Sequence, residues 1–172
     1  MKKEALLPVM RRTLLALMVV FTAVLQNTVF SAGRISAFLL IPAAVSVAIF
    51  EKEFSGMFFG LLCGALWDLA SPVTDGVFAL VFAVCACACG LLSRYIFRNT
   101  LASALLMTVV FSGAVFAVNA LFYCFARDPG GVGVYFLRRF LPSAAVTVLI
   151  LPVYYYAVRS LEKKMNVSFS AF

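Results

Sequence analysis

The sequence predicts an all-α integral membrane protein with about six transmembrane helices in a single bundle. Of its 172 residues, 65% are hydrophobic and only 12% are charged, whereas a soluble domain carries about 25% charged residues. Several apolar runs approach or exceed the roughly 20 residues that cross the hydrocarbon of a bilayer. Because most of the chain lies in these runs, we expect one transmembrane domain over residues 1–172 and no separate soluble domain.

The first two predicted spans cover residues 13–32 and 35–50 and are joined by a tight turn. The first is broken only by the polar pair Gln26 and Asn27. We interpret it as an uncleaved helix, because the run is long for a signal peptide and bulky Phe30 precedes the candidate cleavage point. A short charged loop separates the second span from the third.

Four further spans follow from the remaining apolar runs and the turn residues between them. The third covers residues 54–71 and ends at a segment with proline and Asp-Gly, which are typical helix breakers. The fourth covers 77–93, the fifth 101–126 and the sixth 140–158, before a basic tail. Boundaries read from such patterns shift by a few residues.

The distribution of lysine and arginine predicts the orientation of the chain in the membrane. An even number of spans places both termini on one side, and ten of the 14 basic residues lie on that side. Cytoplasmic loops carry the excess of basic residues. We therefore expect a multi-pass membrane protein with both termini in the cytoplasm. The four basic residues on the other side are Arg34, Arg127, Arg138 and Arg139.

The third span carries a glycine at every fourth position and then an acidic residue. Gly56, Gly60, Gly64 and Asp68 follow one another at intervals of four, and a step of four turns a helix by only about 40°. The four positions therefore share one face, which small residues make suitable for close helix packing. We expect this face to pack within the monomer or, as the alternative, against a helix of a partner protein.

Asp68 has three possible roles, because an ionisable residue within a span is a candidate functional site. It can act as a structural ion-pair member or hydrogen-bond acceptor, with Arg34 as a candidate partner. It can face a bound protein, or it can bind or relay a substrate or proton. We favour the structural role, since no second acidic residue lies deep in any predicted span.

The other strongly polar residues of the spans are predicted to collect in the outer half of the membrane. Counting about 1.5 Å per residue from the span ends places three amide side chains about 10 Å inside the outer ends of their spans and one arginine at such an end. We treat them as an outer polar cluster whose role is open: Gln26, Asn27, Arg34 and Asn119.

The composition argues against an enzyme, a metal site, a cofactor and nucleic-acid binding. The chain has no histidine, the commonest general base and metal ligand, and no phosphate-binding loop. On a helix Cys87 points about 200° away from Cys85, so Cys85, Cys87 and Cys89 cannot converge on one metal, and we interpret them as packing residues. The net charge of +7 comes from basic pairs at span ends, which favour membrane lipid rather than nucleic acid.

Several segments resemble the MreD family of rod shape-determining membrane proteins. The main match is Gly56-Met-Phe-Phe-Gly-Leu-Leu-Cys-Gly-Ala-Leu-Trp-Asp68, followed by a turn and Gly76-Val-Phe-Ala-Leu80. The basic stretch from Arg94 to Arg98 and the segment Leu151-Pro-Val-Tyr154 with its basic tail are also similar to the family pattern. The cysteines at 85–89 depart from the ordinary apolar residues of that pattern.

The resemblance implies a non-catalytic scaffold of the bacterial cell-elongation machinery. A MreD-like protein associates with MreC, a single-span protein with a large extracytoplasmic part. It works with MreB filaments, RodA and a class B penicillin-binding protein in lateral peptidoglycan synthesis and rod cell shape. The resemblance implies no cofactor.

The alternative is a substrate-binding membrane subunit of an energy-coupling-factor-type vitamin transporter, which MreD-like chains resemble in size and number of spans. Such a subunit holds its ligand in a cavity open to the outside, which the outer polar cluster would suit. Short, simple outer loops favour the scaffold. A lipid transporter is a third and less favoured class.

Overall fold

The computed structural model describes residues 2–30, 38–51, 53–70, 76–95, 100–126 and 141–170. All regular secondary structure in these ranges is helical, which confirms the predicted all-α class. Four stretches are long and apolar enough to cross a membrane: Val9–Thr28, Val77–Tyr95, Leu101–Phe122 and Leu141–Lys163. The protein is therefore a multi-pass membrane protein.

In chain order the helices are α1 (Lys2–Leu25), the π-helix η1 (Gln26–Phe30), α2 (Leu40–Phe50), α3 (Glu53–Ala70), α4 (Val77–Tyr95), α5 (Leu101–Ala126) and α7 (Leu141–Ser170).

Three helix bounds differ clearly from the predicted spans. Helix α1 begins at Lys2 rather than at residue 13, and α7 extends to Ser170 rather than ending at 158. Hydropathy marks only the part of a helix that lipid surrounds, whereas polar residues of good helix propensity continue both helices beyond it. Helix α2 begins at Leu40, not at residue 35, and residues 35–37 lie outside the described ranges.

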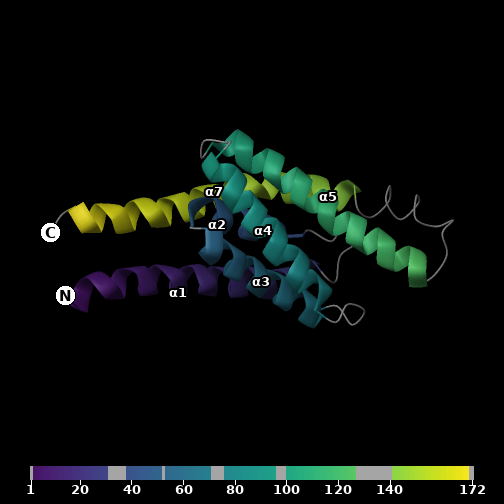
Figure 1. Cartoon of the computed structure of the whole chain (residues 1–172), viewed down its shortest axis with the longest axis horizontal. Helices are drawn as coiled ribbons and strands as arrows, with labels where there is room; N and C mark the ends of the chain where they lie inside the picture. The colour runs from purple at the N-terminus through teal and green to yellow at the C-terminus, as the bar shows by residue number, and fades with distance from the viewer. Residues whose placement is uncertain are drawn as a thin grey trace.

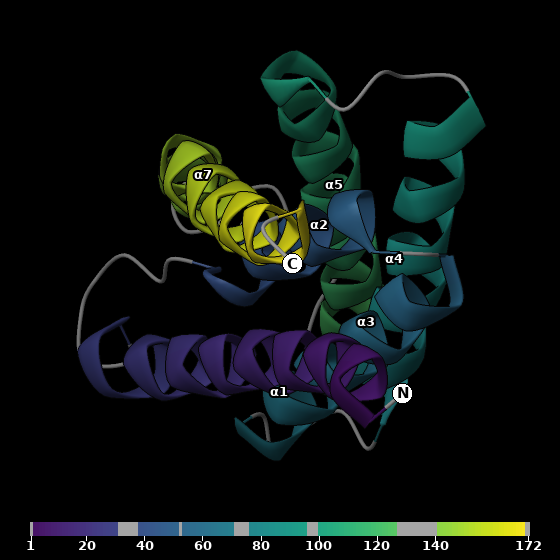
Figure 2. The ribbon, with the colours of Figure 1, turned by 90° about the vertical axis from the view of Figure 1, so that its left-hand side faces the viewer.

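Helix α2 lies in the middle of the bundle and the other helices surround it (Figure 2). It contacts α1, α3, α4, α5 and α7, and every residue from Leu40 to Ile49 is buried. The hydrophobic core consists of α2 and the faces that the other helices turn toward it. Its largest fully buried side chains outside α2 are Val19, Phe78, Phe82, Phe111, Val115, Leu151, Tyr155 and Val158.

With 11 residues, α2 is about 16 Å long, roughly half the thickness of the hydrocarbon. A helix that ends at membrane depth needs protein around it, because lipid offers no hydrogen bonds to its backbone. The buried position of α2 meets this need. The free ends of α1 and α7 lie at the same end of the molecule (Figure 1). The count of six crossings and the side of the termini stay predictions.

Candidate functional site

The glycines of α3 lie where this helix meets its neighbours most closely. Helices α3 and α4 form the most extensive helix pair of the described structure. A methyl group added at Gly60 would lie 2.5 Å from Ala86 Cβ and 2.6 Å from the carbonyl oxygen of Phe82. One at Gly64 would lie 2.5 Å from Ala79 Cα. Both glycines therefore let the backbone of α4 approach α3 more closely than any side chain would allow.

Gly56 packs against a different helix, α2. A methyl group there would lie 3.2 Å from Cα of Ala48 in α2. The three glycines thus face two helices of the same chain, α2 at one end and α4 over the rest. A partner helix could reach α3 at Gly60 or Gly64 only by displacing α4.

Asp68 completes this contact by capping α4. Its carboxylate accepts hydrogen bonds from the backbone N–H groups of Ala79 at 2.8 Å and Phe78 at 3.4 Å. These N–H groups belong to the first turn of α4, which has no intrahelical acceptors for them. An N-cap side chain normally serves them, but Gly76 precedes α4, with φ of 83°, and has no side chain. Asp68 supplies the acceptor from the neighbouring helix instead.

Gly64 and Asp68 act together, because they lie one turn apart on α3 and face the same turn of α4. Gly64 brings the backbone at Phe78 and Ala79 close, and this closeness places their N–H groups within reach of the short aspartate side chain. The indole of Trp67 packs beside them, with its ring centroid 5.7 Å from those of Phe78 and Phe82 and 5.1 Å from that of Phe38. The charge of Asp68 is thus held at a helix end within the protein.

The outer polar cluster does not act as one group where the structure describes it. The side-chain oxygen of Gln26, in η1, accepts a hydrogen bond from the backbone N–H of Leu40 at 3.0 Å. Asn119 donates instead to the carbonyl oxygen of Val115 in its own helix. Asn27 is exposed, and Arg34 lies outside the described residues. Gln26 and Asn119 therefore serve separate helices.

The beginning of α2 is held by side chains from two other helices. Besides the Gln26 contact, the N–H of Phe38 donates to the hydroxyl of Thr147 in α7 at 3.1 Å. The same hydroxyl donates to the carbonyl oxygen of Ser143. A buried helix start needs such acceptors because its first N–H groups lack intrahelical partners.

The remaining N–H groups of the first turn of α2 are also accounted for. Ile41 donates to the carbonyl oxygen of Phe38 at 3.2 Å, and Ala43 donates to that of Leu39 at 3.3 Å. Pro42 has no N–H, so its position in the first turn removes one donor that would need an acceptor. The start of α2 at Leu40 follows from this set of contacts.

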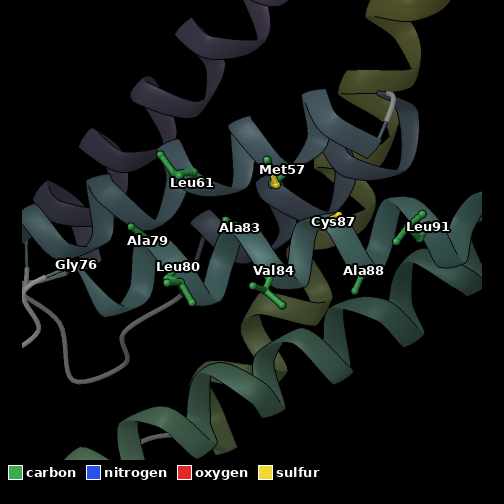
Figure 3. Close-up of a pocket in the computed structure, with 10 residues that line it drawn as sticks. All are labelled: Met57, Leu61, Gly76, Ala79, Leu80, Ala83, Val84, Cys87, Ala88 and Leu91. Atoms are coloured by element: carbon green, nitrogen blue, oxygen red, sulfur yellow. The ribbon is translucent and has the colours of Figure 1, made fainter.

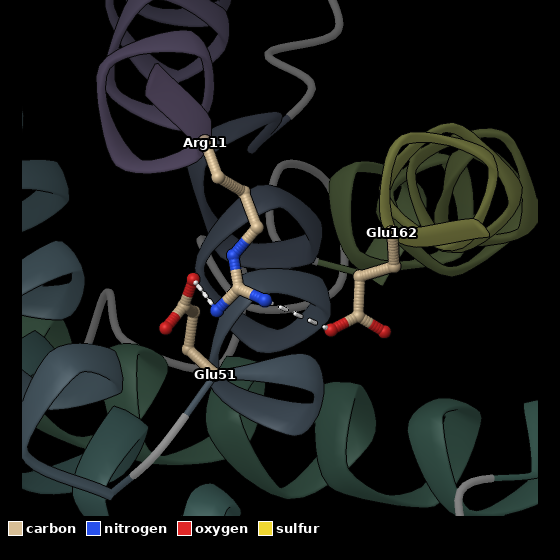
Figure 4. A network of polar contacts seen from close by, with 3 residues as sticks. All are labelled: Arg11, Glu51 and Glu162. Atoms are coloured by element: carbon tan, nitrogen blue, oxygen red, sulfur yellow. Dashed lines mark hydrogen bonds and ion pairs between the residues drawn. The ribbon is translucent and has the colours of Figure 1, made fainter. Parts of the chain in front are cut away.

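A charged cluster at the other end of α2 joins three helices (Figure 4). Arg11 of α1 contacts Glu51, which follows the last residue of α2, at 2.5 Å and Glu162 of α7 at 3.6 Å. The side chain of Glu51 is only 2% exposed, and a carboxylate at a helix C-terminus is disfavoured by the helix dipole. Arg11 compensates both the burial and the unfavourable position of this charge.

Sequence reasoning missed the charged cluster. It placed Glu51 in a short charged loop between two spans and counted Arg11 only among the basic residues of the cytoplasmic side. The two residues are 40 positions apart, and periodicity carries no signal for such a contact. The presence of an acidic residue directly after a predominantly apolar run was the available hint.

Two open grooves lie on the outside of the described structure. The α3–α4 groove has a volume of about 590 Å³ and runs along α4 from Gly76 to Leu91, with Met57 and Leu61 of α3 on one side (Figure 3). Its lining is apolar throughout. The α1–α3 groove is smaller, about 340 Å³, and includes Arg12 at one end.

The described cysteines are free thiols. Cys63 and Cys89 are buried, and Cys85 and Cys87 are half-buried. Among the residues that the structure describes, no group of three or more His, Cys, Asp or Glu side chains could hold a metal ion.

Comparison with family models, with curated proteins and with solved structures gives no match to this chain. The resemblance to the MreD family therefore stays an expectation drawn from the residues themselves.

Proposed function

We propose that the protein is a non-catalytic, MreD-like scaffold of the bacterial cell-elongation machinery. In this role it associates with a MreC-like single-span protein in the cytoplasmic membrane and supports lateral peptidoglycan synthesis and rod shape. MreB, RodA and a class B penicillin-binding protein are the further partners that this role implies.

The observation that carries the proposal is the structural role of the segment that resembles the family. The residues of the match, from Gly56 to Asp68 and from Gly76 to Leu80, form the closely packed α3–α4 pair and its cap. Their chemistry is that of helix association: glycines allow backbone contact, and the carboxylate satisfies a helix end. A motif with this purpose suits a membrane body that holds other proteins in place.

The polar groups elsewhere in the described residues support the same role. Gln26 and Thr147 serve the beginning of α2, and Arg11 joins α1, α2 and α7 through two carboxylates. Tyr154 of α7 donates to the hydroxyl of Thr22 in α1 at 3.1 Å. These contacts stabilise the bundle, while large apolar side chains such as Leu80, Leu149 and Val153 face outward, where lipid or a partner's span can cover them.

The test is co-purification from mild detergent with the MreC-like protein of the same organism. We expect the two proteins to elute as one complex, and an unrelated multi-pass protein of similar size, expressed in the same way, to elute without it. In cells, depletion of the protein should convert rods to rounded cells, and expression from a plasmid should restore the rods.

Mass spectrometry of the same preparation distinguishes the alternative. A tightly retained vitamin-sized molecule, with no MreC-like protein bound, would favour a substrate-binding transporter subunit. Unchanged rod shape after depletion, together with no complex in detergent, would contradict the scaffold proposal.

A further inference from the structure

The α1–α3 groove is polar at one end and apolar along the rest of its length. Arg12 of α1 and Ser55 of α3 line one end, and Ala16, Phe58, Phe59 and Leu62 line the remainder. Ser55 lies in the first turn of α3, and Arg12 is next to Arg11, which contacts Glu51 just before that turn. The two polar residues therefore lie at the same level of the bundle.

Arg12 lines the α1–α3 groove and differs from its neighbour in its described contacts. Its neighbour Arg11 is engaged by Glu51 and Glu162. Arg12 itself is exposed, and no ion pair joins it to a carboxylate among the side chains that the structure describes. An arginine guanidinium suits a phosphate group, which it can hold through two parallel hydrogen bonds.

The position of Arg12 matches the depth of a lipid head group. It lies near one end of the apolar stretch Val9–Thr28 of α1, where the hydrocarbon gives way to the polar region of the bilayer. Ala16, one turn further along α1, and Leu62, two turns beyond Ser55 on α3, lead from this level into the hydrocarbon. The order of polar and apolar lining is thus that of a phospholipid, head group first and acyl chain second.

We propose that the α1–α3 groove is a binding site for one anionic phospholipid. Its phosphate contacts the Arg12 guanidinium and the Ser55 hydroxyl, and one acyl chain lies along Ala16, Phe58, Phe59 and Leu62. The volume of about 340 Å³ falls within the range of small-ligand sites, about 300–1,000 Å³. The site does not depend on the proposed scaffold function.

The α3–α4 groove provides an internal comparison. It is larger and equally open to the outside, but its lining contains no charged residue. It can hold acyl chains without preferring any head group, so selectivity for anionic lipid should arise at the α1–α3 groove.

The test is native mass spectrometry of the purified full-length protein. The protein is mixed with equal amounts of phosphatidylglycerol and phosphatidylcholine that carry the same acyl chains, and retained lipid is counted. We expect preferential retention of one phosphatidylglycerol, reduced about five- to tenfold in Arg12→Gln. Arg159→Gln, which removes an exposed arginine of α7, is the matched control and should retain the lipid as the wild type does.

Ala16→Phe tests the apolar part of the site, because it fills the groove and leaves Arg12 in place. It should reduce retention of phosphatidylglycerol to the level of Arg12→Gln. Thermal unfolding of each variant in detergent shows that it is folded, and Ala16→Leu replaces Ala16→Phe if the larger side chain prevents folding. Equal retention of the two lipids by the wild type, wild-type retention by Arg12→Gln, or an equal loss in Arg159→Gln would overturn the proposal.

Discussion

At the scale of single residues, the carboxylate of Asp68 takes the place that an N-cap side chain occupies in most helices. It belongs to α3, yet it accepts hydrogen bonds from the first turn of α4. The position before α4 is Gly76, which allows the left-handed turn but cannot cap. Asp68 of α3 therefore supplies to α4 the capping acceptor that Gly76 lacks.

Replacement of Asp68 tests this role. Asp68→Ala removes the acceptor and should destabilise the protein by about 1 kcal/mol, the typical cost of losing an N-cap. Asp68→Asn keeps a side-chain oxygen and should lose clearly less. Thermal unfolding in detergent measures both. Equal losses in the two variants would show that the charge, rather than the hydrogen bonds to α4, is what the position requires.

The sequence predicted Asp68 as a structural acceptor with Arg34, which lies outside the described residues, as a candidate partner. It did not predict the contact with α4. The polar character of one residue within an apolar span is visible in the sequence, because lipid excludes such a group. In α4 its carboxylate meets a pair of backbone N–H groups, which every residue except proline carries and which therefore leave no sequence signal. The spacing of Gly64 and Asp68 showed a shared helix face, but not that α4 would lie on it.

At the scale of elements, the face formed by Gly56, Gly60 and Gly64 determines how closely three helices pack. Gly56 receives α2, and Gly60 and Gly64 receive α4. Close backbone contact gains dispersion energy along the whole contact, which matters in lipid, where the hydrophobic effect does not drive helices together.

A single methyl group should reveal the dependence on close packing. Gly60→Ala forces the carbonyl of Phe82 and the side chain of Ala86 away, and we expect a loss of about 1–3 kcal/mol. Gly113→Ala in α5 is the matched control, because a methyl group there meets nothing within 4 Å. It should leave stability unchanged or raise it by up to about 1 kcal/mol through helix propensity.

Thermal unfolding in one detergent compares the two glycine variants directly. If Gly60→Ala were as stable as Gly113→Ala, helix α4 would not lie against α3 as the structure shows.

The buried start of α2 offers a second test at this scale. Thr147→Val keeps the shape of the side chain but removes the acceptor of the Phe38 N–H, and should cost about 1–3 kcal/mol. Ser46→Ala is the control, because the Ser46 hydroxyl is buried in α2 and has no hydrogen-bond partner among the described residues. It should unfold at the wild-type temperature, and a loss equal to that of Thr147→Val would contradict the assigned contact.

The predicted helix bounds were accurate where turn-forming or charged residues flank the apolar run, and they were inaccurate where such residues do not mark the helix end. Helices α4 and α5 begin and end within two residues of the predicted spans 77–93 and 101–126. Helix α7 continues through Pro152, although proline often ends a helix. The start of α2 depends on Gln26 and Thr147, which are distant in the sequence, so the apolar run alone could not locate it.

At the scale of the whole molecule, the cluster of Arg11, Glu51 and Glu162 ties the first, central and last helices together. The side chain of Glu51 is almost fully buried, and an unpaired buried carboxylate is costly. Arg11 is 29% exposed and also contacts Glu162. The stability of the bundle therefore depends on Arg11 more than on either carboxylate.

A double-mutant cycle measures this dependence. Arg11→Gln leaves the buried Glu51 carboxylate without its arginine and should lower the free energy of unfolding by about 3–5 kcal/mol. This loss should exceed that of Glu51→Gln. The variant with both changes should be more stable than Arg11→Gln alone, because no buried carboxylate remains unpaired. Thermal unfolding of the three variants gives the coupling, and additive losses would show that the two side chains do not stabilise each other.

The predicted orientation can be checked in intact cells. After the five native cysteines are replaced, Lys3→Cys and Ser170→Cys should react with a membrane-impermeant maleimide only after lysis, because both termini are predicted to be cytoplasmic. Asp128→Cys, in a predicted outer loop, is the positive control and should react before lysis. Labelling of either terminus in intact cells would reverse the orientation.

The contacts of α7 also have a consequence for the order in which the protein matures. Thr147 completes the beginning of α2, Tyr154 reaches Thr22 of α1, and Glu162 reaches Arg11. All three donors and acceptors leave the ribosome after the helices that need them. In the nascent chain, the N–H of Phe38 at the beginning of α2 therefore lacks its acceptor until α7 has been synthesised. A chain shortened before α7 would present this unpaired backbone group to the machinery that inserts and degrades membrane proteins.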